Sequence, residues 1–126
     1  MTRLIAILFA TMILAMPARA NEAVRQVISN QIAAFKQDDF ETAFSYASPT
    51  IRGIFGTSDN FGQMVRQGYP MVWRPAQVEF LGVEQVGPVL RQDVLIRDGD
   101  GVLYELEYEM IEGRDGRQSA GELKPL

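Results

Sequence analysis

The segment Tyr104–Met110 carries the residue types best placed for chemistry, because two tyrosines alternate there with apolar residues and with glutamates. Side chains two apart on a strand point to the same face, so Tyr104 and Tyr108 share one face with Leu106. On the wall of an apolar cavity, a phenol hydroxyl donates a hydrogen bond that orients a small ligand. Core packing, with each hydroxyl bonded to a protein group, is the structural alternative.

The same alternation places Glu105, Glu107 and Glu109 on the opposite face of this predicted strand. A row of like charges is typical of a solvated surface. Carboxylates two residues apart on a strand spread too widely to enclose a hard cation tightly. The turn Asp98–Gly101 begins like a calcium-binding loop, but apolar residues follow where the next acid and glycine belong. We therefore predict no metal site.

A second group of candidate residues surrounds the prolines of the segment Tyr69–Pro75. Its aromatic rings offer a stacking platform, and the Arg74 guanidinium offers a planar fork for a carboxylate or phosphate. The two prolines predict a nonhelical, extended hinge between the helical half and the strand half, because proline removes an N–H donor and biases the preceding residue toward extended backbone. Such a hinge is also the structural alternative to a ligand-facing rim. The predicted ligand-binding residues are thus Tyr104 and Tyr108 inside the cavity and Tyr69, Trp73 and Arg74 at its rim.

The chain contains neither histidine nor cysteine, and this excludes several classes of enzyme. Hydrolase triads that use histidine, HExxH zinc sites, thiolate nucleophiles and disulfides all require one of these two residues. The segment Gly53–Gly56 lacks the lysine and hydroxyl residue of a phosphate-binding loop, and no Rossmann glycine pattern is present. We predict no cofactor and no catalytic residue.

Residues 1–20 have the pattern of a secretory signal peptide. Arg3 precedes an apolar run from Leu4 to Met16, and the small-residue site Ala18-Arg19-Ala20 follows. The apolar run is shorter than the roughly 20 residues that a membrane-spanning helix needs, which disfavours an uncleaved anchor. We expect cleavage between Ala20 and Asn21, a single mature domain over residues 21–126, and a periplasmic or secreted location without a stable membrane anchor.

The charge balance of the predicted mature domain argues against nucleic acid as a partner. The whole chain has 12 basic and 16 acidic residues, and both leader arginines belong to the basic set. The mature domain is therefore clearly acidic, whereas nucleic-acid binding relies on basic surfaces. The partners that remain are a small apolar ligand, a partner protein, or a second copy of the chain paired through the sheet.

Helical patterns fill the first half of the mature chain. Apolar residues recur at helical spacing over residues 21–37, and Asp38-Asp39 is a suitable N-cap for a second helix from Phe40 to Ala47. Ser48-Pro49 begins a short helix that ends at Gly56, and Ser58-Asp59 begins another that ends at Gly68.

The second half alternates with period two, which is typical of strands. We predict strands over residues 78–83, 90–96 and 102–110. A three-residue loop, Gly99-Asp100-Gly101, pairs Ile96 with Tyr104 and gives one apolar face, whereas a two-residue loop would mix the faces. In this register Arg91 lies opposite Glu109. Residues 117–126 form a poor strand by composition, because only Leu123 and Leu126 are large and apolar.

Helices followed by an antiparallel meander indicate an α+β domain. The order of elements resembles the cystatin-like or nuclear transport factor two-like cone. That resemblance implies N-terminal helices on the concave face of a curved antiparallel sheet of three to five strands. The chain is also similar to an uncharacterised family of secreted proteobacterial proteins, domain of unknown function 4864. The similar segments are residues 27–35, 43–49, 55–61, 65–70 and 73–75.

The family resemblance implies no established activity and no catalytic residues, and the chain departs from the family's closing-strand pattern at residues 117–122. We expect a noncatalytic module that binds a small apolar or amphipathic ligand, or a partner protein, through the mouth of the cone. The alternative is an isomerase- or dehydratase-like enzyme with a carboxylate base and a tyrosine donor. That alternative needs an acid on the tyrosine face, and the register places none from β-strand residues there.

Overall fold

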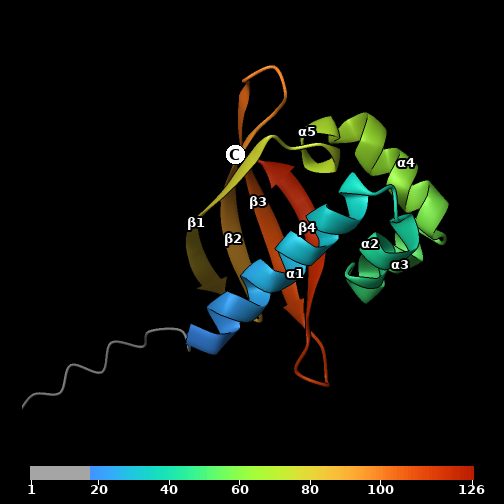
Figure 1. The fold of residues 1–126 in the computed structure, drawn as a ribbon. Helices are drawn as coiled ribbons and strands as arrows, with labels where there is room; N and C mark the ends of the chain where they lie inside the picture. The colour runs from blue at the N-terminus through green and yellow to red at the C-terminus, as the bar shows by residue number, and fades with distance from the viewer. Residues whose placement is uncertain (1–17) are drawn as a thin grey trace, which may run out of the picture.

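Helices cover one face of an antiparallel sheet in the computed structural model, which describes residues 18–126 (Figure 1). The predicted leader lies outside the described residues, apart from its last three positions. The helices are α1 (Ala18–Lys36), α2 (Phe40–Ser45), α3 (Pro49–Phe55), α4 (Ser58–Gly68) and α5 (Pro70–Trp73), and the strands are β1 (Gln77–Val86), β2 (Val89–Arg97), β3 (Leu103–Glu112) and β4 (Gln118–Pro125). The α+β class predicted from the sequence is confirmed.

Helix α1 runs across the covered face of the sheet (Figure 1) because one of its sides is apolar. Val24, Ile28 and Phe35 are almost completely buried, and their spacing places them on a single stripe of the helix. The helix ends where Asp38 adopts a positive φ of 54°, a backbone conformation typical of helix C-termini. The N–H of Asp39 then donates to the carbonyl of Ala34 at 2.9 Å, which closes the last turn.

Side-chain caps separate α2, α3 and α4. Asp39, Ser48 and Thr57 each accept a hydrogen bond from the N–H three residues further on, at 3.2–3.3 Å. These bonds satisfy donors that the first turn of a helix leaves free. The predicted caps at Asp39 and Ser48 are confirmed, whereas the prediction of Ser58-Asp59 was wrong because the preceding threonine performs this role.

The predicted extended hinge over Tyr69–Pro75 is also wrong, since Pro70–Trp73 forms the single helical turn α5. Pro70 occupies the first position of this turn, where a missing N–H leaves no helical hydrogen bond unmade. The N–H of Trp73 donates to the carbonyl of Tyr69 at 3.1 Å. Pro75 follows beyond the end of the turn and leads into β1.

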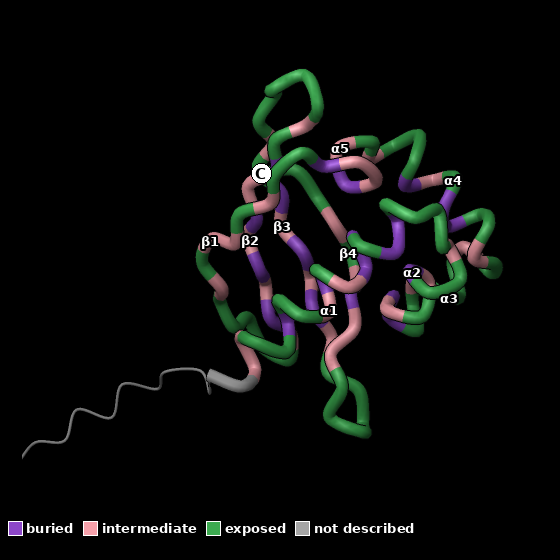
Figure 2. The backbone as a smooth tube through the Cα atoms, viewed as in Figure 1, coloured by how far each residue is buried: buried purple, intermediate pink, exposed green. Residues whose placement is uncertain are grey.

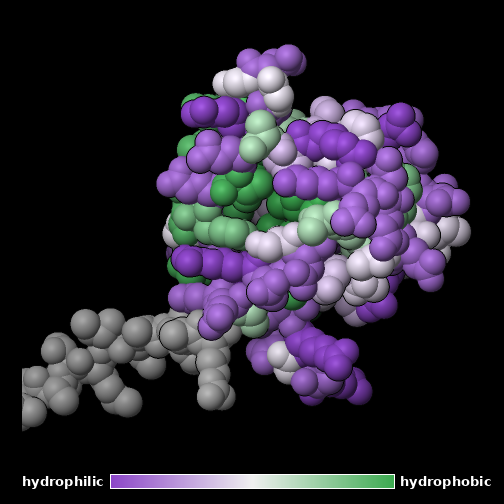
Figure 3. Space-filling model, viewed as in Figure 1, coloured by the Kyte–Doolittle hydropathy of each residue, from purple (hydrophilic) through white to green (hydrophobic). Residues whose placement is uncertain are grey.

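The four strands lie in sequence order, and β2 and β3 pair in the predicted register. Gly101 has a φ of 82°, which allows the chain to turn between them. Buried and more exposed positions alternate along both strands (Figure 2). Apolar side chains gather in the middle of the molecule between polar margins (Figure 3). The inward pairs are Ile96 with Tyr104, Val94 with Leu106, and Leu90 with Met110.

Residues 118–125 form a complete edge strand, so the expectation of a poor strand was wrong. Backbone pairing, which side-chain composition does not reveal, holds this strand on both sides. It pairs with β3, and the segment between α2 and α3 pairs with Ala120 on the other side. The N–H of Ser48 donates to the Ala120 carbonyl at 2.7 Å, and the N–H of Ala120 donates to the Tyr46 carbonyl at 2.8 Å.

Phenylalanines form the contact between the helices, with Phe61 at their centre. Its ring centroid lies 5.3–5.8 Å from those of Phe35, Phe44 and Phe55. These tilted arrangements are favourable for aromatic pairs. Gly62 follows in α4, and a Cβ there would overlap the ring of Phe40. Close contact between α2 and α4 therefore depends on this glycine.

Two glycine-to-alanine substitutions should change stability in opposite directions. We expect Gly62→Ala to lower the free energy of unfolding by about 1–3 kcal/mol, because the added methyl overpacks the Phe40 contact. Gly53→Ala is the matched control within α3, where a Cβ meets no atom within 4 Å. It should raise stability by about 0.5–1 kcal/mol through helix propensity alone. Urea denaturation measures both values, and stabilisation by Gly62→Ala would contradict the packing described.

Candidate functional site

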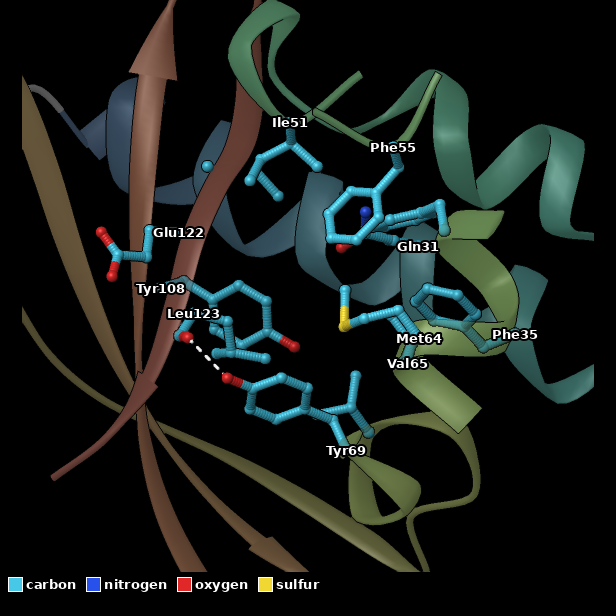
Figure 4. Close-up of a pocket in the computed structure, with 14 residues that line it drawn as sticks. Gln31, Phe35, Ile51, Phe55, Met64, Val65, Tyr69, Tyr108, Glu122 and Leu123 are labelled. Atoms are coloured by element: carbon cyan, nitrogen blue, oxygen red, sulfur yellow. Dashed lines mark hydrogen bonds between the residues drawn. The ribbon is translucent and has the colours of Figure 1, made fainter. Parts of the chain in front are cut away.

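A cavity of about 240 Å³ lies between the helices and the sheet (Figure 4). Helices α1, α3, α4 and α5 form one side of it, and β3 and β4 form the other. Most of its wall is apolar or aromatic, as is usual for sites that bind small molecules. The lining residues are Gln31, Phe35, Ile51, Phe55, Phe61, Met64, Val65, Tyr69, Val72, Tyr108, Ala120, Gly121, Glu122 and Leu123.

Tyr108 contributes a buried hydroxyl group to the lining of this cavity. The residue is only 2% exposed, yet no residue in the described part of the chain forms a hydrogen bond with its hydroxyl. In Figure 4 the hydroxyl points from β3 into the cavity. A tyrosine hydroxyl is protonated at neutral pH, and burial raises the pKa of Tyr108 further above its ordinary value. The cavity therefore contains a neutral hydrogen-bond donor without a protein acceptor.

Tyr69 also lines the cavity, but its hydroxyl already has a partner. It donates to the carbonyl of Leu123 at 3.0 Å, as the dashed line in Figure 4 shows. This bond connects the segment between α4 and α5 to β4 across the lower end of the cavity. Tyr69 was predicted at the rim of the cavity and lies in its lining, and its oxygen retains capacity to accept a hydrogen bond.

Gln31 is a cavity residue that the sequence analysis missed. It is 4% exposed, and its Nε2 donates to the carbonyl of Ala43 at 3.1 Å. This bond uses one of the two Nε2 hydrogens, and the side chain extends toward the cavity (Figure 4). A signal was present in the sequence, because Gln31 interrupts the apolar stripe of α1 between Ile28 and Phe35.

Tyr104 shares the inner face with Tyr108, as predicted, but the structure does not place it on the cavity wall. It lies near the β2–β3 turn, where its hydroxyl donates to Oδ2 of Asp98 at 3.3 Å. Desolvation raises the pKa of Tyr104, and the adjacent Asp98 carboxylate adds to this shift. The two predicted cavity tyrosines therefore have different surroundings and different partners.

Trp73 and Arg74 likewise lie outside the cavity lining and join α5 to the end of α1. The Trp73 Nε1 donates to Oδ1 of Asp38 at 2.8 Å, and Nη2 of Arg74 lies 3.1 Å from the same oxygen. Arg74 also donates to the carbonyl of Phe35, and its guanidinium carbon lies 3.9 Å from the centroid of the Trp73 ring. These contacts give Trp73 and Arg74 a structural role, because they connect α5 to the end of α1.

The outer face of the sheet carries the glutamate row, as predicted, together with the neighbouring Asp93. Burial raises the pKa of Asp93, and the charges of Glu107, Glu105 and Glu84 raise it further. Among residues 20–126, no group of three acidic side chains has the geometry to hold a metal ion. This face is therefore an acidic surface with internal charge repulsion.

Cross-strand ion pairs offset part of this repulsion. Arg91 lies opposite Glu109 in the predicted register, but its Nε is nearest to Glu107, at 3.7 Å from Oε1. Lys124 of β4 lies 3.5 Å from the same oxygen. The prediction of an Arg91–Glu109 pair was therefore correct in register, while the ion pair forms one diagonal position away.

Asp38 and Asp93, two of the aspartates whose pKa is shifted, should affect the pH dependence of stability in opposite ways. The Trp73 hydrogen bond and the Arg74 charge hold the pKa of Asp38 below its ordinary value of 3.8. The ionised form thus stabilises the fold above that pH, and this contribution is lost as the pH falls through the folded-state pKa. Asp93 has a raised pKa, so its ionised form destabilises the fold at neutral pH.

We therefore expect Asp38→Asn to lower the Tm at pH 7 and Asp93→Asn to raise it. The Asp93 difference should shrink as the pH falls through the raised folded-state pKa toward 3.8, whereas the Asp38 difference should shrink as the pH falls below 3.8. Thermal unfolding between pH 7 and pH 3 measures these differences. Two variants with shifts of the same sign at pH 7 would contradict the assigned electrostatic environments.

Replacing each cavity tyrosine by phenylalanine tests whether its hydroxyl stabilises the fold. The Tyr69 hydroxyl has a hydrogen-bond partner, whereas the Tyr108 hydroxyl has none among the described residues. Tyr69→Phe should lower the free energy of unfolding by about 0.5–1.5 kcal/mol, because it removes the hydrogen bond to the Leu123 carbonyl. Tyr108→Phe should leave the stability unchanged or raise it slightly, since no protein bond is lost. Chemical denaturation tests both, and a marked loss with Tyr108→Phe would mean that its hydroxyl serves the fold.

These features define an α+β protein in which helices and one face of a four-stranded antiparallel sheet enclose a small, mostly apolar cavity. The chain belongs to the family described as Domain of unknown function (DUF4864), whose model matches residues 17–120. The family resemblance predicted from the sequence is thus confirmed. Among curated proteins, none matches this chain.

Solved structures from three bacteria align with the chain. A SEC-C motif containing protein from Rhodopseudomonas palustris has a TM-score of 0.56 at 17% identity, covering 79% of this chain and 76% of its own. A structure from Catenulispora acidiphila has a TM-score of 0.54 at 15% identity, covering 86% and 92%. An NTF-2 like protein of unknown function from Burkholderia xenovorans LB400 has a TM-score of 0.48 at 16% identity, covering 83% and 84%. The first two alignments show a shared fold only.

A helix can cross a membrane only if it is long enough and apolar enough. Over residues 18–126, no helix is both long enough and apolar enough to cross a bilayer.

Proposed function

We propose that this protein binds a small, mostly apolar molecule in the cavity beneath α3 and α4 and does not transform it. The observation that carries this proposal is the Tyr108 hydroxyl, which is buried, directed into the cavity and without an acceptor among the described residues. A ligand with an acceptor group would provide the missing partner. The expected leader peptide would place this binding in the periplasm or outside the cell.

The free energy of an unpaired hydroxyl supports a ligand over simple core packing. Leaving a buried donor unsatisfied costs about 1–3 kcal/mol, whereas phenylalanine would fill nearly the same volume at no such cost. Buried polar groups in folded proteins almost always have a partner. An occupant of the cavity with an acceptor group would pair with the Tyr108 hydroxyl, whereas the packing of β3 supplies no acceptor among the described residues.

The arrangement favours binding over the isomerase- or dehydratase-like alternative. That chemistry needs a carboxylate base close to the tyrosine donor. Glu122 is the charged residue of the cavity lining, but it is exposed and its carboxylate points away from the cavity in Figure 4. Asp38, Asp39 and Asp59, the acids at helix starts, lie outside the lining.

Benzyl alcohol, which combines one apolar ring with one hydroxyl, is a suitable probe of this proposal. Its titration into the ¹⁵N-labelled protein should give saturable shifts of the Val65, Tyr108 and Leu123 amides. Met64→Trp should abolish these shifts, because Met64 extends into the cavity in Figure 4 and the larger side chain would fill it.

Met64→Leu is the matched control, since it nearly conserves side-chain volume. It should bind benzyl alcohol like the natural chain, and thermal unfolding should verify that both variants are folded. Absence of saturable shifts in the natural chain, or identical binding by a folded Met64→Trp variant, would overturn the proposed function.

A further inference from the structure

We infer that the cavity selects an uncharged molecule of about one ring, or an equally short chain, that carries an amide or hydroxyl group. This inference rests on the proposed function and adds the chemical class of the ligand. Three properties of the cavity carry it: its volume, the two polar atoms that face it, and the lack of a countercharge in its lining.

The volume sets the size of the ligand. A cavity of about 150 Å³ holds a benzene molecule, whereas pockets for drug-sized ligands range from about 300 to 1,000 Å³. The volume here, about 240 Å³, lies between these limits. A single substituted ring fits this volume, whereas a fused polycyclic molecule or a long acyl chain is larger than it.

The polar atoms set the type of functional group. Tyr108 offers a hydroxyl donor, and its raised pKa keeps the proton in place. The Ala43 carbonyl accepts a hydrogen bond from Nε2 of Gln31, which fixes the amide orientation and leaves Oε1 as the acceptor on the cavity side. A group that both accepts and donates, such as a primary amide or a hydroxyl, matches this pair.

The absence of a countercharge excludes ionised ligands. Among the cavity-lining residues in the described chain, none is a lysine or arginine, and the single carboxylate, Glu122, points away from the interior. An ion moved from water into a mostly apolar site without a partner loses far more free energy than a neutral amide does. The cavity should therefore reject a carboxylate of the same shape as an accepted amide.

Benzamide, benzoate and toluene form a probe set that tests this inference at pH 7, because they share one ring and differ in the polar group. Titrations of the ¹⁵N-labelled full chain should give a Kd for benzamide at least about 10-fold lower than for benzoate. Tyr108→Phe should weaken benzamide binding about 3- to 10-fold, the range of one neutral hydrogen bond, and leave toluene binding unchanged. Tyr104→Phe is the control, since its hydroxyl bonds Asp98 outside the cavity, and it should change neither.

The results of these titrations distinguish a failure of the neutral-ligand inference from a failure of the proposed function. Benzoate binding as tightly as benzamide, or benzamide binding that Tyr108→Phe leaves unchanged, would overturn the neutral-ligand inference while preserving a binding cavity. Toluene binding without benzamide binding would do the same. If none of these probes nor benzyl alcohol shifts the cavity amides, the proposed function itself is wrong.

Discussion

The backbone pairing around Ala120 is the constraint on which the cavity depends. The segment between α2 and α3 donates to and accepts from this one residue, so the helical half is bonded directly to the edge of the sheet. On its other side, β4 is paired with β3, which carries Tyr108. This attachment helps to set the position of Ile51 and Phe55 of α3 above the strands, together with the contact between Phe55 and Phe61. The walls of the cavity are therefore held by backbone hydrogen bonds as well as by side-chain packing.

Features of the fold that depend on particular side chains could be predicted from the sequence, whereas a feature that depends on backbone pairing could not. The register of β2 and β3 follows from side-chain alternation, because a slip of one residue would expose every apolar group on the inner face. Asp39 and Ser48 could be recognised because capping uses specific side chains. Strand β4 has few apolar residues and is positioned by its backbone, so composition gave the wrong expectation. Helix α5 was missed because Pro70 is compatible with both an extended segment and the first turn of a helix.

The candidate site was predictable only in part, for a geometric reason. Tyr104 and Tyr108 lie on the same face, as periodicity requires, but four residues along a strand span about 13 Å. A cavity of about 240 Å³ is too small to include both side chains. Gln31 is distant in sequence from the strands and shares a cavity with Tyr108 only after α1 packs on the sheet. Periodicity assigns residues to faces, whereas the position of a cavity along a face depends on tertiary packing.

Helix α3 is the one helix of the cavity wall that has no fully buried residue. No residue between Pro49 and Phe55 is fully buried, and Ile54 at its outer side is 66% exposed. The helix begins at the bonded Ser48 and ends at Gly56, whose φ of 75° marks a change in chain direction. Segments with so little buried surface open locally at a small fraction of the global unfolding free energy. Local opening of this one short helix would therefore widen the cavity without unfolding the sheet or α1.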